Sequence, residues 1–354
     1  MPEHAAPDPF PARMRDLSLG HRVLLIGGSL NQTTMMHAVG RHLAAHRCAY
    51  TPYYGDGIVR WASRRGYLDR TVLGGAMRRQ TVDYLHRASL PIDEGGRTGP
   101  YDLIITGSDL LVQRNIRRRP LVLIQEGMTD PETLGFHLVR RFGLPRWIAS
   151  TAATGLSLAY SRFCVASDGF RDLFIRRGVP ADRVVVTGIP NFDDCAAYMT
   201  NGFPHRGYVL VATSDTRETL KRDDRAKFFS KVREIAGDRP IIVKLHPNES
   251  AARSIPEVKA ALPNARIFHD GNAHHMVANC DVLITQWSTL VFDGLALGKE
   301  CHSSFDINEL RRLCPIQNRG TSAAHIARVC EDVLEHANAR RPDRVALDPM
   351  KEAS

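Results

Sequence analysis

Polar side chains that could bind a ligand or take part in catalysis follow three apolar runs in the second half of the chain. The runs are 208–212, 241–243 and 282–284, and the side chains are Thr213, Ser214, Lys244, His246, Ser288 and Thr289. Hydroxyl, imidazole and ammonium groups suit a phosphate or diphosphate leaving group, because they neutralise the charge that develops on it. An imidazole can also protonate the leaving phosphate. We therefore predict one phosphate-binding edge, built from three strand ends of a parallel sheet.

The segment 280–300 shows how such an edge is built. Val282, Leu283 and Ile284 form a short apolar run typical of a strand covered on both faces. A polar turn follows, after which Ser288 or Thr289 can cap a helix that ends near Gly298. The start of a helix attracts anions through its free N–H groups and its dipole. An ordinary capped helix without a ligand is the alternative.

The first half opens with an apolar run at 23–26, a loop and an expected helix at 35–45. The loop contains Gly27, Gly28, Ser29 and Asn31. Strand, glycine loop and helix form the opening unit of a doubly wound sheet, and the glycines permit close approach of backbone or ligand. The loop lacks the GxGxxG pattern, so dinucleotide binding is not expected.

A carboxylate follows the apolar run 121–124, where the chain reads Gln125-Glu126-Gly127. Ligands of open α/β sheets bind beyond the carboxyl ends of the strands, so Glu126 is our candidate general base. Asp130 and Glu132 are better placed to cap the next helix. The basic, partly amphipathic segment 136–147 suits either a membrane surface or a solvated helix.

Length and composition favour two globular domains. The 354 residues carry a net charge of +9, which suggests an anionic partner such as a nucleotide, phosphate or anionic lipid. No motif or basic run with interleaved aromatics indicates nucleic acid. The seven cysteines form no CxxC pair, which argues against a structural zinc site or disulfide framework. No run is long enough for a transmembrane helix, and the N-terminus lacks a signal-peptide core, so we expect a cytoplasmic protein.

We expect the chain to divide into five parts. These are a disordered leader (1–18), a first Rossmann-like domain (19–190), a linker (191–206), a second Rossmann-like domain (207–340) and a tail (341–354). The turn formers Gly188 and Pro190 mark the start of the linker.

These motifs resemble those of the GT-B glycosyltransferase superfamily. Lys244-Leu245-His246-Pro247 resembles the His-Pro motif of bacterial sialyltransferases and Kdo transferases, and Ser288-Thr289 resembles their Ser-Ser/Thr motif. Glu126-Gly127 is similar to their acidic-acidic-glycine motif, with Gln125 at the first acidic position. The stretch 281–299 also resembles the CDP-glycerol glycerophosphotransferases, although Gln286-Trp287 replaces their Asp-Tyr. The segment 186–190 is similar to the domain-joining segment of the UDP-N-acetylglucosamine 2-epimerases.

The resemblance implies an α/β protein whose two doubly wound domains face a central cleft. It further implies a bacterial, metal-independent transferase without a cofactor, acting in cell-surface polysaccharide synthesis. Such an enzyme moves a sugar or glycerophosphate from a nucleotide-activated donor to a glycan or lipid-linked acceptor. CMP- or CDP-linked donors fit the motifs best. Contact with the membrane surface would be peripheral. The alternatives are an epimerase-like enzyme acting on UDP-sugar and a catalytically inactive GT-B protein that binds nucleotide.

The resemblance also assigns roles to residues of this chain. Glu126 would act as base and His246 as the second catalytic group. The loop of Gly27, Gly28, Ser29 and Asn31 would lie on the acceptor side. The residues that would hold the donor are Thr213, Ser214, Lys244, His246, Pro247, Ser288, Thr289 and Asp293.

Overall fold

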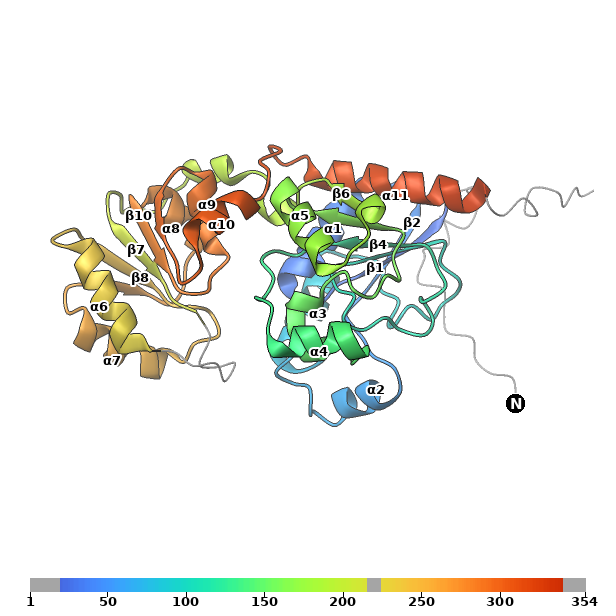
Figure 1. Ribbon diagram of the computed structural model, residues 1–354, viewed down its shortest axis with the longest axis horizontal. Coiled ribbons are helices and arrows are strands. Elements are labelled where there is room, and N and C mark those ends of the chain that lie inside the picture. The colour runs from blue at the N-terminus through green and yellow to red at the C-terminus, as the bar shows by residue number, and fades with distance from the viewer. Residues whose placement is uncertain (1–19, 215–223, 340–354) are drawn as a thin grey trace, which may run out of the picture. The chain divides into compact units, whose positions relative to one another are not determined.

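The computed structural model describes residues 20–214 and 224–339. The predicted leader and tail lie outside the described residues. The chain divides into two compact units. Unit 1 comprises Met1–Val165, Arg171–Asn191 and Thr321–Ser354, and unit 2 comprises Ala166–Phe170 and Phe192–Gly320. Each unit contains one parallel sheet with helices packed against it (Figure 1), so the predicted pair of α/β domains is confirmed.

Unit 1 is built on a six-stranded parallel sheet in the order β2-β1-β3-β4-β5-β6. The strands are β1 (Arg22–Ile26), β2 (Arg47–Thr51), β3 (Leu103–Thr106), β4 (Leu121–Ile124), β5 (Arg162–Val165) and β6 (Val184–Val186). The side chains of β3 and β4 are buried throughout, which explains why these strands read as uninterrupted apolar runs.

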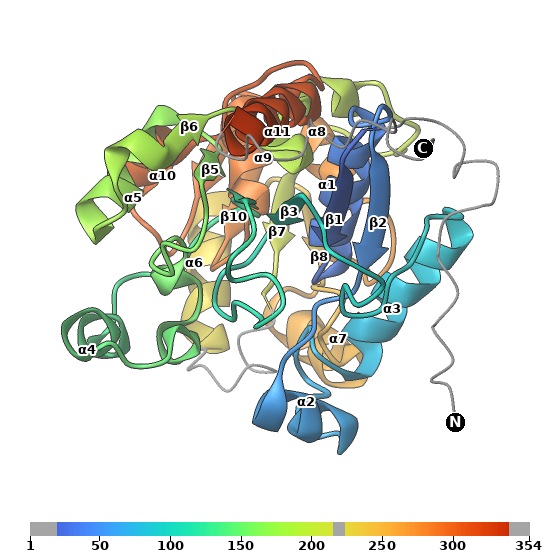
Figure 2. The same ribbon diagram turned by 90° about the vertical axis from the view of Figure 1, so that its right-hand side faces the viewer.

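The helices of unit 1 are unevenly distributed along the sheet. They are α1 (Leu30–Arg41), α2 (Gly57–Arg64), α3 (Gly75–Arg87), α4 (Leu134–Phe142), most of α5 (Asp168–Arg177) and α11 (Ser322–Ala339), with 3₁₀ turns at Arg146–Ala153 (η2) and Ala181–Arg183 (η3). Helix α11 packs against α1, β3 and β5 (Figure 2). The connection from β3 to β4 contains no helix, so a loop takes the place of the usual crossover helix.

Unit 2 is built on a five-stranded parallel sheet in the order β11-β10-β7-β8-β9. The strands are β7 (Val209–Ala212), β8 (Ile241–Lys244), β9 (Arg266–Phe268), β10 (Val282–Thr285) and β11 (Glu300–His302). The helices are α6 (Arg225–Ala236), α7 (Ala251–Ala261), α8 (Ala273–Asn279), α9 (Leu290–Ala296) and α10 (Ile307–Leu313), with a 3₁₀ turn at Cys195–Met199 (η5). Another 3₁₀ turn, Pro190–Phe192 (η4), lies where the chain passes from unit 1 to unit 2. Apolar residues of α6 and α7, among them Phe228 and Val258, close one face of this sheet.

The structure corrects two expected boundaries. Helix α11 was expected in the second domain, but it belongs to unit 1 because its buried face packs on α1 and on the first sheet. The expected linker 191–206 is not a separate segment: residues from Phe192 onward belong to unit 2 and include η5. No helix of the described residues combines the length and apolar character needed to cross a membrane.

Candidate functional site

Glu126 lies directly beyond β4 and is held by side chains from the start of α1. The hydroxyl of Ser29 donates to Glu126 Oε1 at 2.7 Å, and the amide of Gln32 donates to Oε2. Ser29 also caps α1, because its Oγ accepts the backbone N–H of Gln32 at 3.2 Å. The N-cap residue of α1, Ser29, thus helps to position the carboxylate of Glu126, and both carboxylate oxygens accept a hydrogen bond.

The glycine loop allows this arrangement by leaving room for side chains of α1. A Cβ on Gly28 would collide with the amide of Gln32, and a Cβ on Gly27 would collide with the hydroxyl of Thr33. The groups that approach these glycines closely are therefore side chains of the protein's own helix α1. Asn31 is exposed and contributes its carbonyl oxygen, which accepts a 3.3 Å hydrogen bond from Asn191.

A small cavity of about 40 Å³ adjoins Glu126 and is lined by Gln32, Gly107, Ser108 and Thr151, among others. Gln125, which is buried and also lines this cavity, donates to the carbonyl of Gly127 at 2.8 Å. The volume suits a water molecule or a single hydroxyl group beside the carboxylate.

In unit 2, the ends of β7 and β8 share one buried polar network. The hydroxyl of Thr213 accepts the backbone N–H of His246 at 3.0 Å and donates to Glu249. Glu249 also accepts the N–H of His246 at 3.0 Å and forms an ion pair with Arg225 at the start of α6. The structure thus brings Thr213 and His246 together, as the sequence predicts. Glu249 and Arg225, which sequence reasoning missed, hold them in place.

Two buried hydroxyl groups at this edge lack a partner among the described residues. They are Ser214 Oγ, directly after the end of β7, and Thr285 Oγ1, at the end of β10. β7 and β10 are hydrogen-bonded neighbours, with Ala212 opposite Thr285. Buried polar groups nearly always have a partner, so these two hydroxyls on adjacent strand ends are exceptions that call for an explanation.

Lys244 has a different environment from the one expected. Its Nζ donates to the carbonyls of Leu245 at 2.7 Å and His269 at 2.8 Å, and the residue is buried. Burial lowers the pKa of this ammonium group, and the nearby carboxylates of Asp270 and Glu249 partly counteract that effect. Lys244 therefore tethers the ends of β8 and β9, and we assign the phosphate contact to other residues.

Ser288 and Thr289 follow β10 and precede α9, as predicted. Ser288 Oγ accepts the N–H of Leu290 at 3.3 Å, whereas Thr289 is exposed and makes no side-chain cap. Pro247 is also exposed, next to His246. These three residues lie at the same edge of the sheet as Thr213 and Ser214, because each follows the carboxyl end of a parallel strand.

Asp293, predicted as a ribose or sugar contact, has no exposed surface. One carboxylate oxygen is bonded to His274 Nδ1 at 2.6 Å, and the other accepts from Cys195 Sγ at 3.4 Å. His274 is about one-third exposed (37%) and stacks on Tyr198 with ring centroids 4.7 Å apart. The carboxylate of Asp293 is therefore used inside the protein, where it holds His274 at the start of α8, and the donor contact of Asp293 stays a prediction.

No three His, Cys, Asp or Glu side chains among the described residues converge on a point that could hold a metal ion. The metal independence of the reaction stays a prediction, since substrates can bring their own ions.

No protein-family profile matches the sequence, and no curated protein matches it. Among solved structures, the MnaA protein of S. aureus, in a co-structure with UDP, is 9% identical, with a TM-score of 0.55 and coverage of 89% of this chain and 97% of that one. The UDP-GlcNAc 2-epimerase from Neisseria meningitidis, bound to UDP-GlcNAc, is 12% identical, with a TM-score of 0.52 and coverage of 88% and 100%. The wall teichoic acid polymerase TagF is 11% identical, with a TM-score of 0.49 and coverage of 89% of both chains.

At these identities, the first two similarities establish the fold alone. They agree with the two parallel-sheet α/β units of this chain, which has the GT-B-type fold that its motifs resemble.

Proposed function

We propose that this chain is a transferase that takes a sugar or glycerophosphate from a nucleotide-activated donor. Unit 2 would bind the nucleotide at the carboxyl edge of its sheet, and Glu126 of unit 1 would deprotonate the acceptor hydroxyl. The acceptor would be a glycan or a lipid-linked glycan, and the reaction would belong to polysaccharide synthesis.

The observation that carries the donor site is the pair of buried hydroxyls, Ser214 Oγ and Thr285 Oγ1, without partners among the described residues. Each unpaired buried hydroxyl destabilises the free protein, and a hydrogen bond to a ligand oxygen would remove that penalty. Phosphate oxygens are such acceptors. In the neighbouring His246, Thr213 and Glu249 fix the backbone N–H, and ring atom Nδ1 accepts the N–H of Asn248 at 3.2 Å. This imidazole would protonate the leaving phosphate.

The acceptor role of Glu126 is supported by its fixed orientation. A general base must hold its carboxylate within hydrogen-bond reach of the hydroxyl that it deprotonates. Ser29 and Gln32 fix the two oxygens of Glu126, and the adjoining cavity leaves room for one hydroxyl group. Removing Ser29 would loosen the carboxylate without removing it.

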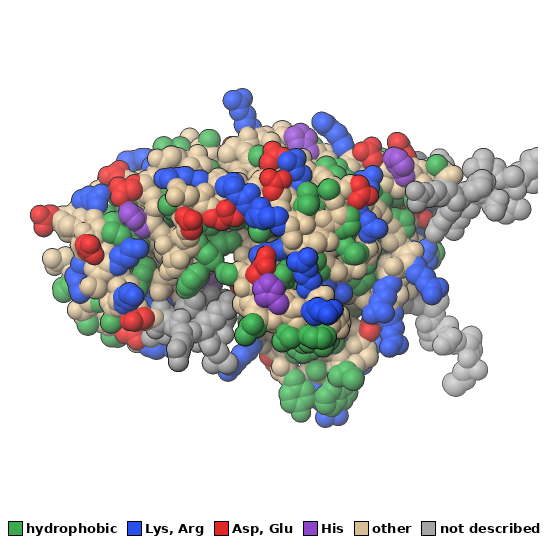
Figure 3. Space-filling model, viewed as in Figure 1, with side chains coloured by type: hydrophobic (Ala, Val, Ile, Leu, Met, Phe, Trp, Pro, Cys, Tyr) green, Lys and Arg blue, Asp and Glu red, His purple; other side chains and the backbone are tan. Residues whose placement is uncertain are grey.

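A lipid-linked acceptor would also explain an exposed apolar face on unit 1. In α4, Phe136 and Val139 face the core, whereas Leu134 and Phe142 are 84% and 67% exposed. Trp147 in η2 is 60% exposed, and arginines flank these apolar residues. Figure 3 shows hydrophobic and basic side chains together where Figure 1 places α4. This combination suits shallow insertion into an anionic bilayer, which Phe142→Glu should weaken in vesicle sedimentation.

A calorimetric panel of CMP, CDP, UMP, UDP and GDP, each with and without magnesium, tests the donor proposal. We expect one pyrimidine nucleotide to bind, and Thr285→Val and Ser214→Ala to weaken it about tenfold each, as the loss of one hydrogen bond to a charged group predicts. His246→Ala should lower turnover while leaving nucleotide binding within a few-fold. Absence of nucleotide binding would refute the proposal.

The epimerase alternative is distinguished by the need for an acceptor. Conversion of UDP-GlcNAc at full rate without any acceptor would assign the chain to that reaction instead. Nucleotide binding without turnover under any condition would assign it to the inactive class.

A further inference from the structure

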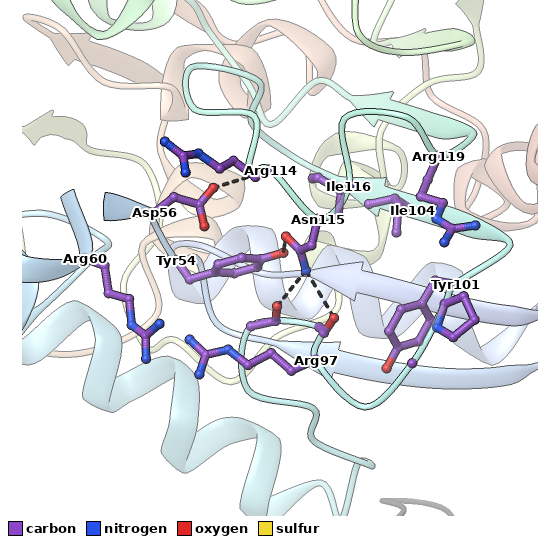
Figure 4. Close-up of a pocket in the computed structure, with 14 residues that line it drawn as sticks. Tyr54, Asp56, Arg60, Arg97, Tyr101, Ile104, Arg114, Asn115, Ile116 and Arg119 are labelled. Carbon is purple, nitrogen blue, oxygen red and sulfur yellow. Dashed lines mark hydrogen bonds between the residues drawn. The ribbon is translucent and has the colours of Figure 1, made fainter. Parts of the chain in front are cut away.

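A basic cavity in unit 1 lies apart from Glu126 and shares no lining residue with the small cavity there. It has a volume of about 500 Å³ and is formed by the loop 93–101, the start of α2 and the β3–β4 connection. Four arginines line it, from three separate segments, together with a single carboxylate, that of Asp56 (Figure 4). The arginines are Arg60, Arg97, Arg114 and Arg119.

Two of these arginines lie close enough to repel each other. The charge of Arg97 is the largest cause that lowers the pKa of Arg60. The guanidinium groups of Arg60 and Arg97 form no hydrogen bond or ion pair with any residue in the described ranges 20–214 and 224–339. An anion placed between them would relieve the repulsion and provide the missing acceptors.

The carboxylates nearest the cavity are already engaged elsewhere. Asp56 accepts the backbone N–H of Arg114 at 2.6 Å, and Glu94 pairs with Arg78 on α3. Asp93 is buried and accepts hydrogen bonds from Tyr101 and from the loop backbone. The charge of Asp56 partly counteracts the effect of Arg97 on the pKa of Arg60. Neither Arg60 nor Arg97, however, forms an ion pair with a carboxylate of the described residues, and four arginines share this cavity with one carboxylate.

The floor of the cavity is fixed by a side-chain network. Tyr54 Oη donates to Asn115 Oδ1 at 3.0 Å, and Asn115 Nδ2 donates to the carbonyls of Gly95 and Gly96 at 2.9 and 3.1 Å (Figure 4). Gly95 and Gly96 have φ values of +76° and +62°, which favour glycine. A Cβ on Gly95 would lie 3.3 Å from Arg97 Nε, so its absence keeps that guanidinium group accessible.

We propose that this cavity binds a phosphate-bearing group, either a soluble phosphate ester or diphosphate, or the headgroup of a phospholipid. A guanidinium group presents a planar pair of N–H donors that matches two phosphate oxygens, so arginines from separate segments can bind one anion together. The volume exceeds that of a single phosphate, which leaves room for the group esterified to it. The proposal is independent of the nucleotide site, which we assign to unit 2.

Inorganic pyrophosphate is the probe for the first test, measured by calorimetry on the full chain in 150 mM salt. We expect saturable binding that Arg60→Ala/Arg97→Ala weakens at least tenfold and that Arg60→Lys/Arg97→Lys weakens less. The matched control, Arg41→Ala/Arg87→Ala, removes the same charge from exposed helical positions of unit 1 and should change the Kd less than twofold.

Vesicles distinguish the two sources of phosphate. Binding to phosphatidylcholine vesicles that contain phosphatidic acid, displaced by pyrophosphate, would identify a lipid headgroup; binding of pyrophosphate without such displacement would identify a soluble ester. The proposal is overturned if the wild-type chain does not bind pyrophosphate, or if the alanine pair binds it as tightly as the wild type while remaining folded by circular dichroism. An equal loss of pyrophosphate affinity in the control variant Arg41→Ala/Arg87→Ala would also overturn it, because binding would then depend on net charge alone.

Discussion

Replacing Thr285 by valine should stabilise the free protein and weaken its ligand binding. The side chain lies at the end of β10, is 2% exposed and leaves Oγ1 without a partner among the described residues. An unpaired buried hydroxyl costs roughly 1–3 kcal/mol, and valine has nearly the same shape and suits a strand. We therefore expect the free energy of unfolding to rise by about 1–2 kcal/mol. Each kcal/mol corresponds to roughly 2–4 °C in melting temperature for a chain of this size.

Thr213→Val is the matched comparison within unit 2. Thr213 is equally buried, at 2% exposed, and follows the adjacent strand β7. Its hydroxyl, however, is bonded to the N–H of His246 and to Glu249, so valine there should cost about 1–3 kcal/mol. Opposite signs are therefore expected from the same substitution at two neighbouring strand ends.

Differential scanning calorimetry with and without nucleotide measures both effects. Thr285→Val should raise the melting temperature of the free protein and reduce the further rise on adding nucleotide, because ligand stabilisation depends on affinity. If Thr285→Val instead lowers the melting temperature as Thr213→Val does, the hydroxyl has a partner in the free protein. The structural argument for the donor site would then fail.

Three further substitutions test other parts of the structure. Glu126→Gln should lower transfer at least 100-fold, the usual contribution of a general base, while leaving the melting temperature nearly unchanged; wild-type turnover would exclude the role. Arg225→Ala should lower the free energy of unfolding by about 3–5 kcal/mol, because it leaves Glu249 buried without its ion pair, and replacing both residues by methionine should recover most of that loss in denaturant titrations. Burial alone would raise the pKa of Asp93, but its hydrogen bonds outweigh burial and lower it. Its stabilising effect is therefore present above about pH 3.9 and is lost as the pH falls through the lower, folded-state pKa, so the deficit of Asp93→Asn should be largest near neutral pH and shrink in acid.

The strands were the most predictable part of the fold. Strands buried on both faces are mostly apolar, and this pattern located β1, β4, β7, β8 and β10 to within a residue or two. Helix α2 was missed because it has only eight residues and its apolar side chains, among them Ile58 and Trp61, are exposed instead of packed on a core. Helix α7 contains Pro256, and β11 has only three residues, so both gave weak signals.

The position of α11 illustrates a limit of a different kind. The sequence of 321–336 indicates a helix, which α11 confirms, but such a pattern does not say which apolar surface the helix covers. Chain order placed it in the second domain, and packing against α1 placed it in the first unit. Sequence alone therefore predicts that such a helix exists more readily than it predicts the surface against which the helix packs.

Asp293 and Lys244 show why site residues are harder to predict than strands. Lys244 ends β8 and Asp293 lies in α9, the helix after β10, and the sequence gives no sign that their charges are used internally. In the structure, the lysine is bonded to two carbonyls and the aspartate to His274.

A buried carboxylate that fixes one ring nitrogen of a half-exposed histidine also sets the orientation of the other nitrogen. His274 begins the helix after β9, at the same sheet edge as Ser288 and Thr213. The donor contact predicted for Asp293 should therefore be tested on His274 as well, with Asp293→Asn as the variant that alters the orientation of the imidazole.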